Sequence, residues 1–248
     1  MQGHLLCRMP LTSRGSQISV SLDYVMEPKS FAEGGGQGFC VYLLDPSVEG
    51  WDQKFDGTGP LGFVGKTGAI VGVGVDCAGI FCEGEPASIA IKRASDSQLL
   101  CKPVAVEGGV VTRKDEFWRK IYITFDIEAN TCDVMIGGKK VLDDVSFTGV
   151  QIPRTVCVAV CAGTAEGRSN RICVNKLKLK DIDSSEKGRC LGAYVDWKVL
   201  GGKLVPSEKD EVWRSAGNAI IGSGFELTQD VDNQQVCTVY PIVKHCHS

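Results

Sequence analysis

The fold is decided by GQGFCVYLLDPSVEGW (residues 36–51) and by GPLGFVGKTGAIVGVGVDCAGI (residues 59–80). Each stretch contains an apolar run of the length of a buried β-strand, bounded by glycine and by turn-forming residues. The second run ends at a single acidic residue, Asp76, with closely spaced glycines around it. Because glycine lets strands and loops approach closely, the pattern predicts a ligand-facing rim around this carboxylate.

Alternating or wholly apolar runs of similar length recur at residues 16–26, 87–94, 120–128 and 155–163. Gly, Pro, Asn and Asp separate these runs, which is typical of antiparallel strands joined by turns. Residues 131–141 predict a hairpin that turns at GGKK, because paired glycines accept the positive φ of a tight turn. Two packed sheets would have a core lined by Val73, Val75, Ile89, Ile91, Ile121, Ile123, Phe125, Val134, Val158 and Val160.

The C-terminal part of the chain is organised differently. Residues 182–215 are polar and are interpreted as a linker or long loop, in which only PSEKDEVWRS (206–215) favours a short helix. Residues 216–248 begin a new β pattern. The expected organisation is therefore a β-sandwich over residues 1–181, the linker or loop, and a further set of strands over residues 216–248.

Composition excludes some classes of partner. The chain has 248 residues, with 27 Lys and Arg scattered among 30 Asp and Glu, so no basic stripe for nucleic acid is expected. No run of about 18 apolar residues is present for insertion into a membrane. The first residues lack the apolar segment of a signal peptide, so the sequence itself leaves the compartment unknown.

The chain contains 12 cysteines, and their placement separates two roles. Cysteine inside an apolar run behaves as a small hydrophobic residue, which predicts buried thiols at Cys40, Cys132, Cys157, Cys161 and Cys173. In an oxidising compartment, disulfides are possible between Cys77 and Cys82 and between Cys237 and Cys246. No Cys-x-x-Cys occurs and the histidines lie near the ends, so no structural zinc site is expected.

With its strands in this order, the sequence resembles the L-type (leguminous-type) lectins of the concanavalin A-like superfamily. GQGFCVYLLD stands where the family has a Gly-Asp-Gly strand, and GPLGFVG where it has a Gly-Leu-Gly turn. VGVGVD stands at the metal-site strand, and residues 147–179 resemble the closing strands with their sugar-contacting loop. The resemblance implies an all-β jelly-roll sandwich of two antiparallel sheets, carbohydrate binding, and an extracellular or secretory location.

The resemblance also bears on the ends of the domain. Residues 197–236 resemble the segment with which family domains begin, so the N-terminal strand is missing from residues 1–181. Two arrangements remain open. Residues 216–248 either complete the sandwich in the same chain or start a second, interrupted domain of a tandem array.

The resemblance implies a carbohydrate-binding site at Gln37, Gly38, Trp51, Asp76, Gly163, Thr164, Ala165 and Glu166. Asp76 stands at the metal-strand position, but Gln37 replaces the sugar-binding Asp, and Gly74 stands where legume members have an acidic ligand. Calcium is therefore expected to bind weakly or not at all, and no other cofactor is expected. Trp51 and Phe55 are candidates for an aromatic surface under a sugar ring. Two alternatives stay open: Asp76 caps a turn, and Trp51 packs on the sandwich edge.

Three functions compete. The leading interpretation is a non-catalytic lectin-like module that binds a glycan or glycoprotein, within a larger or tandem protein, through a degraded calcium and sugar site. The alternative is a protein-interaction or structural sandwich. A glycoside hydrolase is less favoured, because the Glu-x-Asp-x-x-Glu spacing of related glucanases is absent and no catalytic residue can be assigned.

Overall fold

The computed structural model describes residues 2–7, 10–28, 37–52, 59–112, 118–163 and 170–182, and five short strands at 197–200, 203–206, 213–217, 220–221 and 225–228. These residues form strands and turns, with one 3-10 turn, η1 (Pro60–Gly62), and no α-helix among them. In the same residues, no helix is long and apolar enough to cross a membrane. The described chain is therefore all-β, as the sequence predicts.

One sheet, called the front sheet, has the strand order β15-β1-β11-β4-β5-β6-β7, with the short β2 also paired to β11. Its pairs are antiparallel. The strands are β1 (Gln2–Cys7), β2 (Leu11–Thr12), β4 (Gly38–Leu44), β5 (Ala69–Asp76), β6 (Ser88–Arg93), β7 (Val104–Ala105), β11 (Thr155–Gly163) and β15 (Trp213–Gly217).

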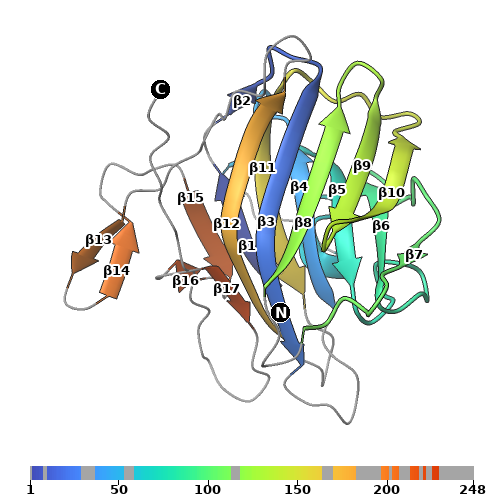
Figure 1. Ribbon diagram of the computed structural model, residues 1–248. Helices are drawn as coiled ribbons and strands as arrows, with labels where there is room; N and C mark the ends of the chain where they lie inside the picture. The colour runs from blue at the N-terminus through green and yellow to red at the C-terminus, as the bar shows by residue number, and fades with distance from the viewer. Residues whose placement is uncertain are drawn as a thin grey trace.

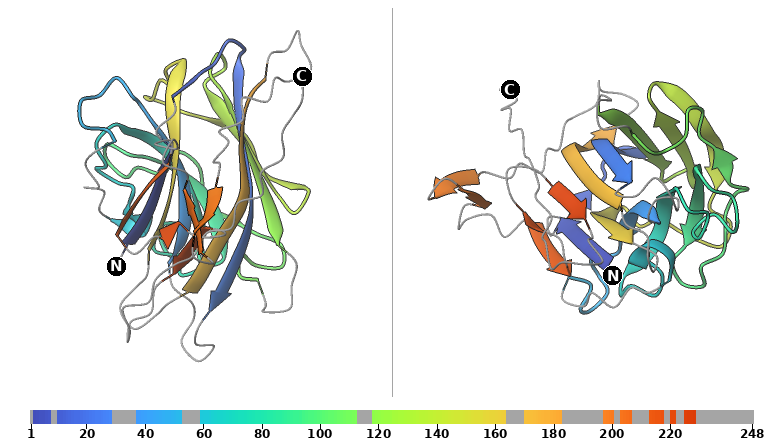
Figure 2. Two further views of the ribbon diagram at one scale, coloured as in Figure 1. Left: turned by 90° about the vertical axis from the view of Figure 1, so that its left-hand side faces the viewer. Right: turned by 90° about the horizontal axis from the view of Figure 1, so that it is seen from below.

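The second sheet, called the back sheet, has the order β10-β9-β8-β3-β12-β17-β16 and is also antiparallel. It lies against the front sheet as the second layer of a sandwich (Figures 1 and 2). Its strands are β3 (Gln17–Pro28), β8 (Arg119–Asp126), β9 (Thr131–Ile136), β10 (Lys139–Ser146), β12 (Asn170–Ile182), β16 (Ile220–Ile221) and β17 (Phe225–Thr228). The predicted sandwich of two antiparallel sheets is confirmed.

The two sheets bury a continuous apolar layer between them, called the inner core. Alternate residues of each strand point into it, because successive side chains of a strand face opposite sides. All ten residues predicted for the core are buried, among them Val73, Ile123 and Val158. The strand period of the sequence therefore predicts which side chains fill this layer.

A second apolar layer, called the outer core, covers the opposite face of the front sheet. Its strand residues alternate with those of the inner core, and its buried aromatic rings are Tyr42 of β4 and Phe63 and Phe81 from the loops on either side of β5. Tyr42 lies 6.1 Å from Phe63, and Phe63 lies 5.7 Å from Phe81, between ring centroids. The buried members are Leu6, Cys40, Tyr42, Leu44, Leu61, Phe63, Phe81, Cys82, Ala90, Ala94, Cys157, Ala159 and Cys161.

The predicted hairpin is confirmed as β9 and β10. Gly137 and Gly138 form its turn with φ values of 58° and 81°, which suit a two-residue turn that requires positive φ at both positions. The register of β10 shifts twice along the pair, between Lys140 and Leu142 and between Leu142 and Val145. These irregularities make β10 a bulged edge strand.

The helix predicted over residues 206–215 is wrong at its C-terminal end. Trp213 begins β15, which pairs with β1 in a register that places Cys7 opposite Trp213. The polar composition favours a helix only in isolation, and the ladder with β1 overrides that local preference.

Further strands lie in the C-terminal part of the chain. β13 (Trp197–Leu200) and β14 (Lys203–Pro206) pair as a hairpin within the segment predicted as a linker or long loop. β17 pairs with β12 over Arg171–Val174. The domain boundaries at 181 and 215 stay predictions.

The cysteines of the described strands behave as predicted. Cys40, Cys132, Cys157 and Cys161 are buried. Cys77 and Cys82 are both present as thiols, and burial raises the pKa of Cys82 to about 12. The side chain of Cys173 and the pair Cys237 and Cys246 lie outside the described residues.

Candidate functional site

Four of the predicted site residues meet at one end of the front sheet. Gly38 begins β4 and is paired with Gly163 at the end of β11 on one side and with Asp76 at the end of β5 on the other. Gln37 precedes Gly38, and η1 lies beside it. These residues, Gln37, Gly38, Leu61, Asp76 and Gly163, are called the rim.

Gly38 is required by the geometry of the rim. Its φ is 125°, a backbone conformation that residues with a side chain rarely adopt. A Cβ at this position would lie 2.1 Å from the carbonyl oxygen of Val75. Glycine therefore lets β4 approach the end of β5 closely enough to form the rim.

Gln37 is held by hydrogen bonds from three directions. Its main-chain N–H donates to Gly163 O at 3.2 Å, and its main-chain carbonyl accepts from Cys77 N at 2.9 Å. Its side-chain Oε1 accepts from Leu61 N at 3.2 Å. A Cβ on Gly163 would lie 2.6 Å from this Oε1, so the glycine makes room for the amide.

These contacts fix the orientation of the Gln37 amide. The carbonyl oxygen of the side chain is used within the rim, and no described residue accepts a hydrogen bond from its Nε2. The side chain is half-buried. The rim thus presents an oriented N–H donor that can bind a hydroxyl oxygen.

Asp76 is fully buried, and its carboxylate organises the loop that follows β5. Oδ1 accepts from the N–H groups of Ala78 and Gly79, both at 2.9 Å, and Oδ2 accepts from Cys82 N at 2.8 Å. Burial raises the pKa of Asp76, and the main-chain N–H donors oppose that rise. This geometry matches the alternative in which Asp76 caps a turn.

The rim does not fit a calcium ion. The N–H groups around Asp76 direct partial positive charge at both carboxylate oxygens, whereas calcium needs six to eight oxygen ligands. A Cβ on Gly74 would lie 2.4 Å from the ring of Phe81, so an acidic ligand at this position has no space. The described part of the chain holds no group of three or more His, Cys, Asp or Glu side chains that could bind a metal.

The glycines of β5 have a different role from the one predicted. Gly72 and Gly74 both face the outer core, where an added Cβ would meet Phe63 at 2.8 Å and Phe81 at 2.4 Å. Their missing side chains make space for aromatic rings. Of the glycines predicted to surround a ligand, those at 72 and 74 therefore serve packing.

Trp51 lies at the opposite end of the front sheet. It packs against the outer core, and its Cβ would be 2.9 Å from a Cβ added to Gly68, the residue before β5. Lys66 Nζ donates to the carbonyl oxygen of Trp51 at 2.6 Å. Because the eight residues of β5 separate Gly68 from Asp76, Trp51 is roughly 26 Å from the rim, at about 3.3 Å per residue.

The other predicted site residues, Thr164, Ala165, Glu166 and Phe55, lie outside the described residues. Sequence reasoning missed Leu61, whose N–H fixes the Gln37 amide. Leu61 has a φ of 60°, which is uncommon for a residue with a side chain. The surrounding Gly-Pro-Leu-Gly signals a tight turn, but a main-chain donor leaves no mark in the sequence.

The sequence matches no protein-family model, and no curated protein is significantly similar to it. The VIP36 exoplasmic/lumenal domain has a similar structure. Its Ca2+/Man-bound form gives a TM-score of 0.51 at 14% identity, over 79% of this chain and 81% of that chain. Its Ca2+/Man3GlcNAc-bound form gives 0.50 at 14% identity, over 75% and 76%.

Peanut lectin with a 9mer peptide gives a TM-score of 0.49 at 17% identity, over 70% of this chain and 77% of that chain. At the identities of the VIP36 structures, similarity establishes the fold alone. The chain has an L-type lectin-like fold.

Proposed function

We propose that the chain is a non-catalytic carbohydrate-binding module, a unit of a larger or tandem protein, whose rim binds a glycan or glycoprotein without calcium. The observation that carries the proposal is the oriented amide of Gln37, with Oε1 held by Leu61 and Nε2 without an acceptor among the described residues. The L-type lectin-like fold supports it. An extracellular or secretory location stays part of the proposal.

The rim offers hydrogen bonding as its chemistry. Gln37 Nε2 donates to a sugar hydroxyl, and the fixed geometry of the amide lowers the entropy cost of binding. Asp76 contributes indirectly, because its hydrogen bonds position the loop beside Gln37. With calcium removed as a ligand-organising group, we expect weak binding to a single sugar.

A glycan array with and without calcium tests the proposal. The wild type should bind a defined set of glycans equally in both conditions. Gln37→Glu keeps the oxygen that accepts from Leu61 but removes the N–H donor, so binding should fall at least tenfold at an unchanged melting temperature. Gln98→Glu makes the same chemical change at an exposed residue that does not belong to the rim, and it serves as the matched control. Equal binding by wild type and Gln37→Glu would contradict the role of the rim.

A second candidate is a protein-interaction or structural sandwich. It is favoured by the full use of the Asp76 oxygens and by two exposed apolar side chains on the back sheet, Tyr122 and Met135, which lie opposite each other on β8 and β9. A wild-type chain that binds no glycan on the array would select this candidate. Release of reducing sugar from a β-glucan would instead select the hydrolase.

We also propose that residues 216–248 belong to the same sandwich as residues 1–181. The support is the pairing of β17 with β12. Deleting residues 216–248 should lower the free energy of unfolding by several kcal/mol, because the back sheet loses the ladder hydrogen bonds that β17 forms with β12. A chain that ends at residue 228 keeps β17 and is the control. Equal stability of the full chain and the longer deletion would favour a second, interrupted domain.

A further inference from the structure

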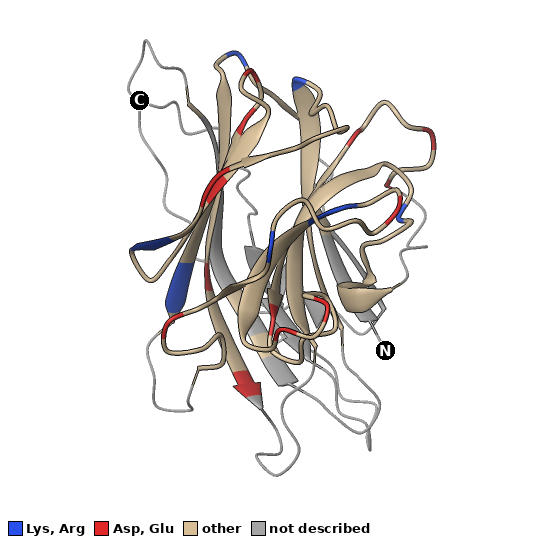
Figure 3. Cartoon of the chain, turned by 90° about the vertical axis from the view of Figure 1, so that its right-hand side faces the viewer, with Lys and Arg blue, Asp and Glu red and all other residues tan. Residues whose placement is uncertain are grey.

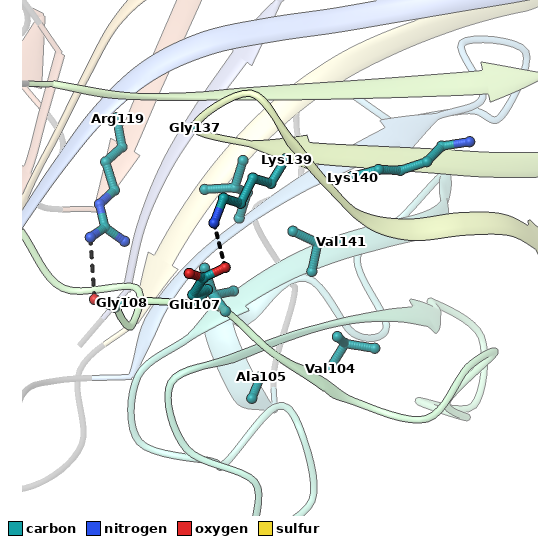
Figure 4. Close-up of a pocket in the computed structure, with 11 residues that line it drawn as sticks. Val104, Ala105, Glu107, Gly108, Arg119, Gly137, Lys139, Lys140 and Val141 are labelled. Carbon is teal, nitrogen blue, oxygen red and sulfur yellow. Dashed lines mark hydrogen bonds and ion pairs between the residues drawn. The ribbon is translucent and has the colours of Figure 1, made fainter.

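A pocket of about 490 Å³ lies where β7 and the loop that follows it meet the start of β8 and the β9–β10 turn (Figure 4). The volume is in the range of small-molecule sites. Asp76 pairs with Ser88, and Ser88 pairs with Ala105, so the pocket is at the same end of the sandwich as the rim. Three strand spacings separate Gly38 from Ala105, roughly 14 Å at 4.8 Å each. The pocket is thus distinct from the rim.

The lining of the pocket is mixed, with apolar side chains beside charged ones. Val104 has 37% of its surface exposed, although it is a large hydrophobic residue. Ile136 and Val106 lie deeper and are buried. A ligand with an apolar face could cover Val104 and displace water from it, which favours binding. The apolar lining residues are Val104, Ala105, Val106, Ile136 and Val141.

Arg119 supplies a fixed positive charge. Its Nη2 donates to Gly108 O at 3.2 Å, and its Nη1 donates to Gly109 O. Gly108 and Gly109 both have a φ of 75°, a conformation that glycine adopts readily and that forms this part of the loop. No described carboxylate forms an ion pair with Arg119. The carbonyls therefore orient the guanidinium without neutralising its charge.

The other charges of the pocket leave this cation in excess. Lys139 and Glu107 form an ion pair that joins the two walls of the pocket, with 65% and 78% of their side chains exposed. Lys140 points away in Figure 4 and pairs with Asp133 and Asp143. An exposed pair contributes little stability, so Lys139 can exchange Glu107 for another anion at low cost. Among the lining residues that the structure describes, the side chains that face the pocket, Glu107, Arg119 and Lys139, carry a net charge of one positive unit.

We propose that this pocket binds a small organic carboxylate that has an apolar face. The carboxylate lies between Arg119 and Lys139, where the guanidinium can form two parallel N–H···O bonds. The apolar face covers Val104 and Val141. This site is independent of glycan binding at the rim.

Ligand-observed NMR and calorimetry on the full chain test the proposal with 2-naphthoate, and with 2-naphthol as its neutral counterpart. The carboxylate should bind at least tenfold more tightly, and its affinity should fall with added salt. Glucuronate separates two sources of the same chemistry. Tighter binding of naphthoate identifies an apolar acid, and tighter binding of glucuronate identifies an acidic sugar.

Two variants change the affinity in opposite directions. Arg119→Gln should weaken naphthoate binding at least tenfold, because the unpaired cation is lost. Glu107→Gln should strengthen it severalfold, because the competing carboxylate is removed and Lys139 is released. Arg154→Gln is the matched control, since Arg154 pairs with Glu128 on the exposed surface and does not line the pocket. Its affinity should equal that of the wild type.

Several results would overturn the proposal: equal affinity for 2-naphthol and 2-naphthoate, equal effects of Arg119→Gln and Arg154→Gln, or weaker binding by Glu107→Gln. If Arg119→Gln fails to fold, the direction of the Glu107→Gln effect still decides. That change affects a side chain on the surface of the loop and breaks only an exposed ion pair.

Discussion

The inner and outer cores lie on the two faces of the same front sheet, yet they are built differently. The inner core contains mainly aliphatic side chains from strands of both sheets. In the outer core, small strand residues, cysteine, alanine and glycine, pack with Tyr42 of β4 and with the rings of Phe63 and Phe81 from loops. One face is therefore covered by regular structure and the other by loops that must be held in place.

This difference explains where the acidic residue of β5 belongs. The loop that carries Phe81 to the outer core has few strand hydrogen bonds of its own, so Asp76 supplies acceptors for its N–H groups. The Asp76 carboxylate thus accepts the loop N–H groups, as main-chain carbonyls of neighbouring strands accept N–H groups in a sheet. In the view of Figure 3, cations and anions are interspersed over the described part of the chain, and no stripe of a single sign is visible.

The largest effect should come from the inner core. Phe125→Ala removes a fully buried ring that lies 6.1 Å from the ring of Phe147, so it should cost about 3–5 kcal/mol of unfolding free energy. Tyr122→Ala on the same strand removes an exposed ring and should cost less than about 1 kcal/mol. Urea denaturation measures both. Similar costs would mean that the inner core is not the main source of stability.

Asp76→Ala should have the next largest effect. It leaves three N–H groups without their acceptor, so we expect a loss of about 2–4 kcal/mol. Asp45→Ala is the control, since Asp45 accepts from Ser47 in an exposed turn and its loss should cost less than about 1 kcal/mol. Hydrogen exchange of residues 77–84 should speed up in Asp76→Ala alone. An unchanged exchange rate would show that Asp76 does not hold the loop of residues 77–84 in place.

The same substitution should have a pH-dependent cost. Because burial raises the pKa of Asp76 above its ordinary value of 3.8, the folded chain binds this proton more tightly than the unfolded chain does. The stability that Asp76 contributes is therefore greatest below pH 3.8 and falls as the pH rises through the folded pKa. Denaturation of the wild type and of Asp76→Ala at pH values below and above the folded pKa measures the difference in their free energies of unfolding. A difference that grows as the pH rises would contradict this prediction.

Gly74→Ala probes the fit between β5 and the loop. The new methyl group would meet the Phe81 ring, so the ring must shift, at a cost of about 1–3 kcal/mol. Phe81→Leu in the same chain should recover part of that loss, because the smaller side chain leaves room for the methyl group. A double-mutant cycle measures the coupling. Additive costs would show that the two residues do not share a packing site.

Calcium should have the smallest effect. Since the residues around Asp76 do not fit the ion, millimolar calcium should change the melting temperature by less than about 2 °C, because stabilisation grows only with occupancy of a site. Differential scanning fluorimetry on the wild type and Asp76→Ala checks this. A rise of roughly 5 °C that disappears in the variant would indicate a calcium site completed by residues outside the described part.

The sequence predicted the inner core because alternation of apolar residues directly records which face of a strand is buried. It predicted the β9–β10 turn because Gly137 and Gly138 have a steric reason to be there. The outer core was not predictable in this way. Phe63 and Phe81 belong to glycine-rich loops, and their contacts with Gly72 and Gly74 depend on tertiary structure.

The candidate site was predicted in part. Gln37, Gly38, Asp76 and Gly163 do meet, because the order of the strands places their ends together. The partners of Asp76 are main-chain N–H groups, which have no signature in the residue types. Trp51 was predicted as an aromatic surface for a sugar because of its residue type, but the length of β5 separates it from the rim.

The two edges beside the pocket affect how this domain meets its neighbours. β7 has only two residues, Val104 and Ala105, and β10 on the other sheet is bulged and carries several charges. A second chain needs a long, regular edge to add a strand by hydrogen bonding, and neither edge offers one. Sandwiches of this kind can therefore be crowded together, at high concentration or in series along one chain, without aggregating through these strands.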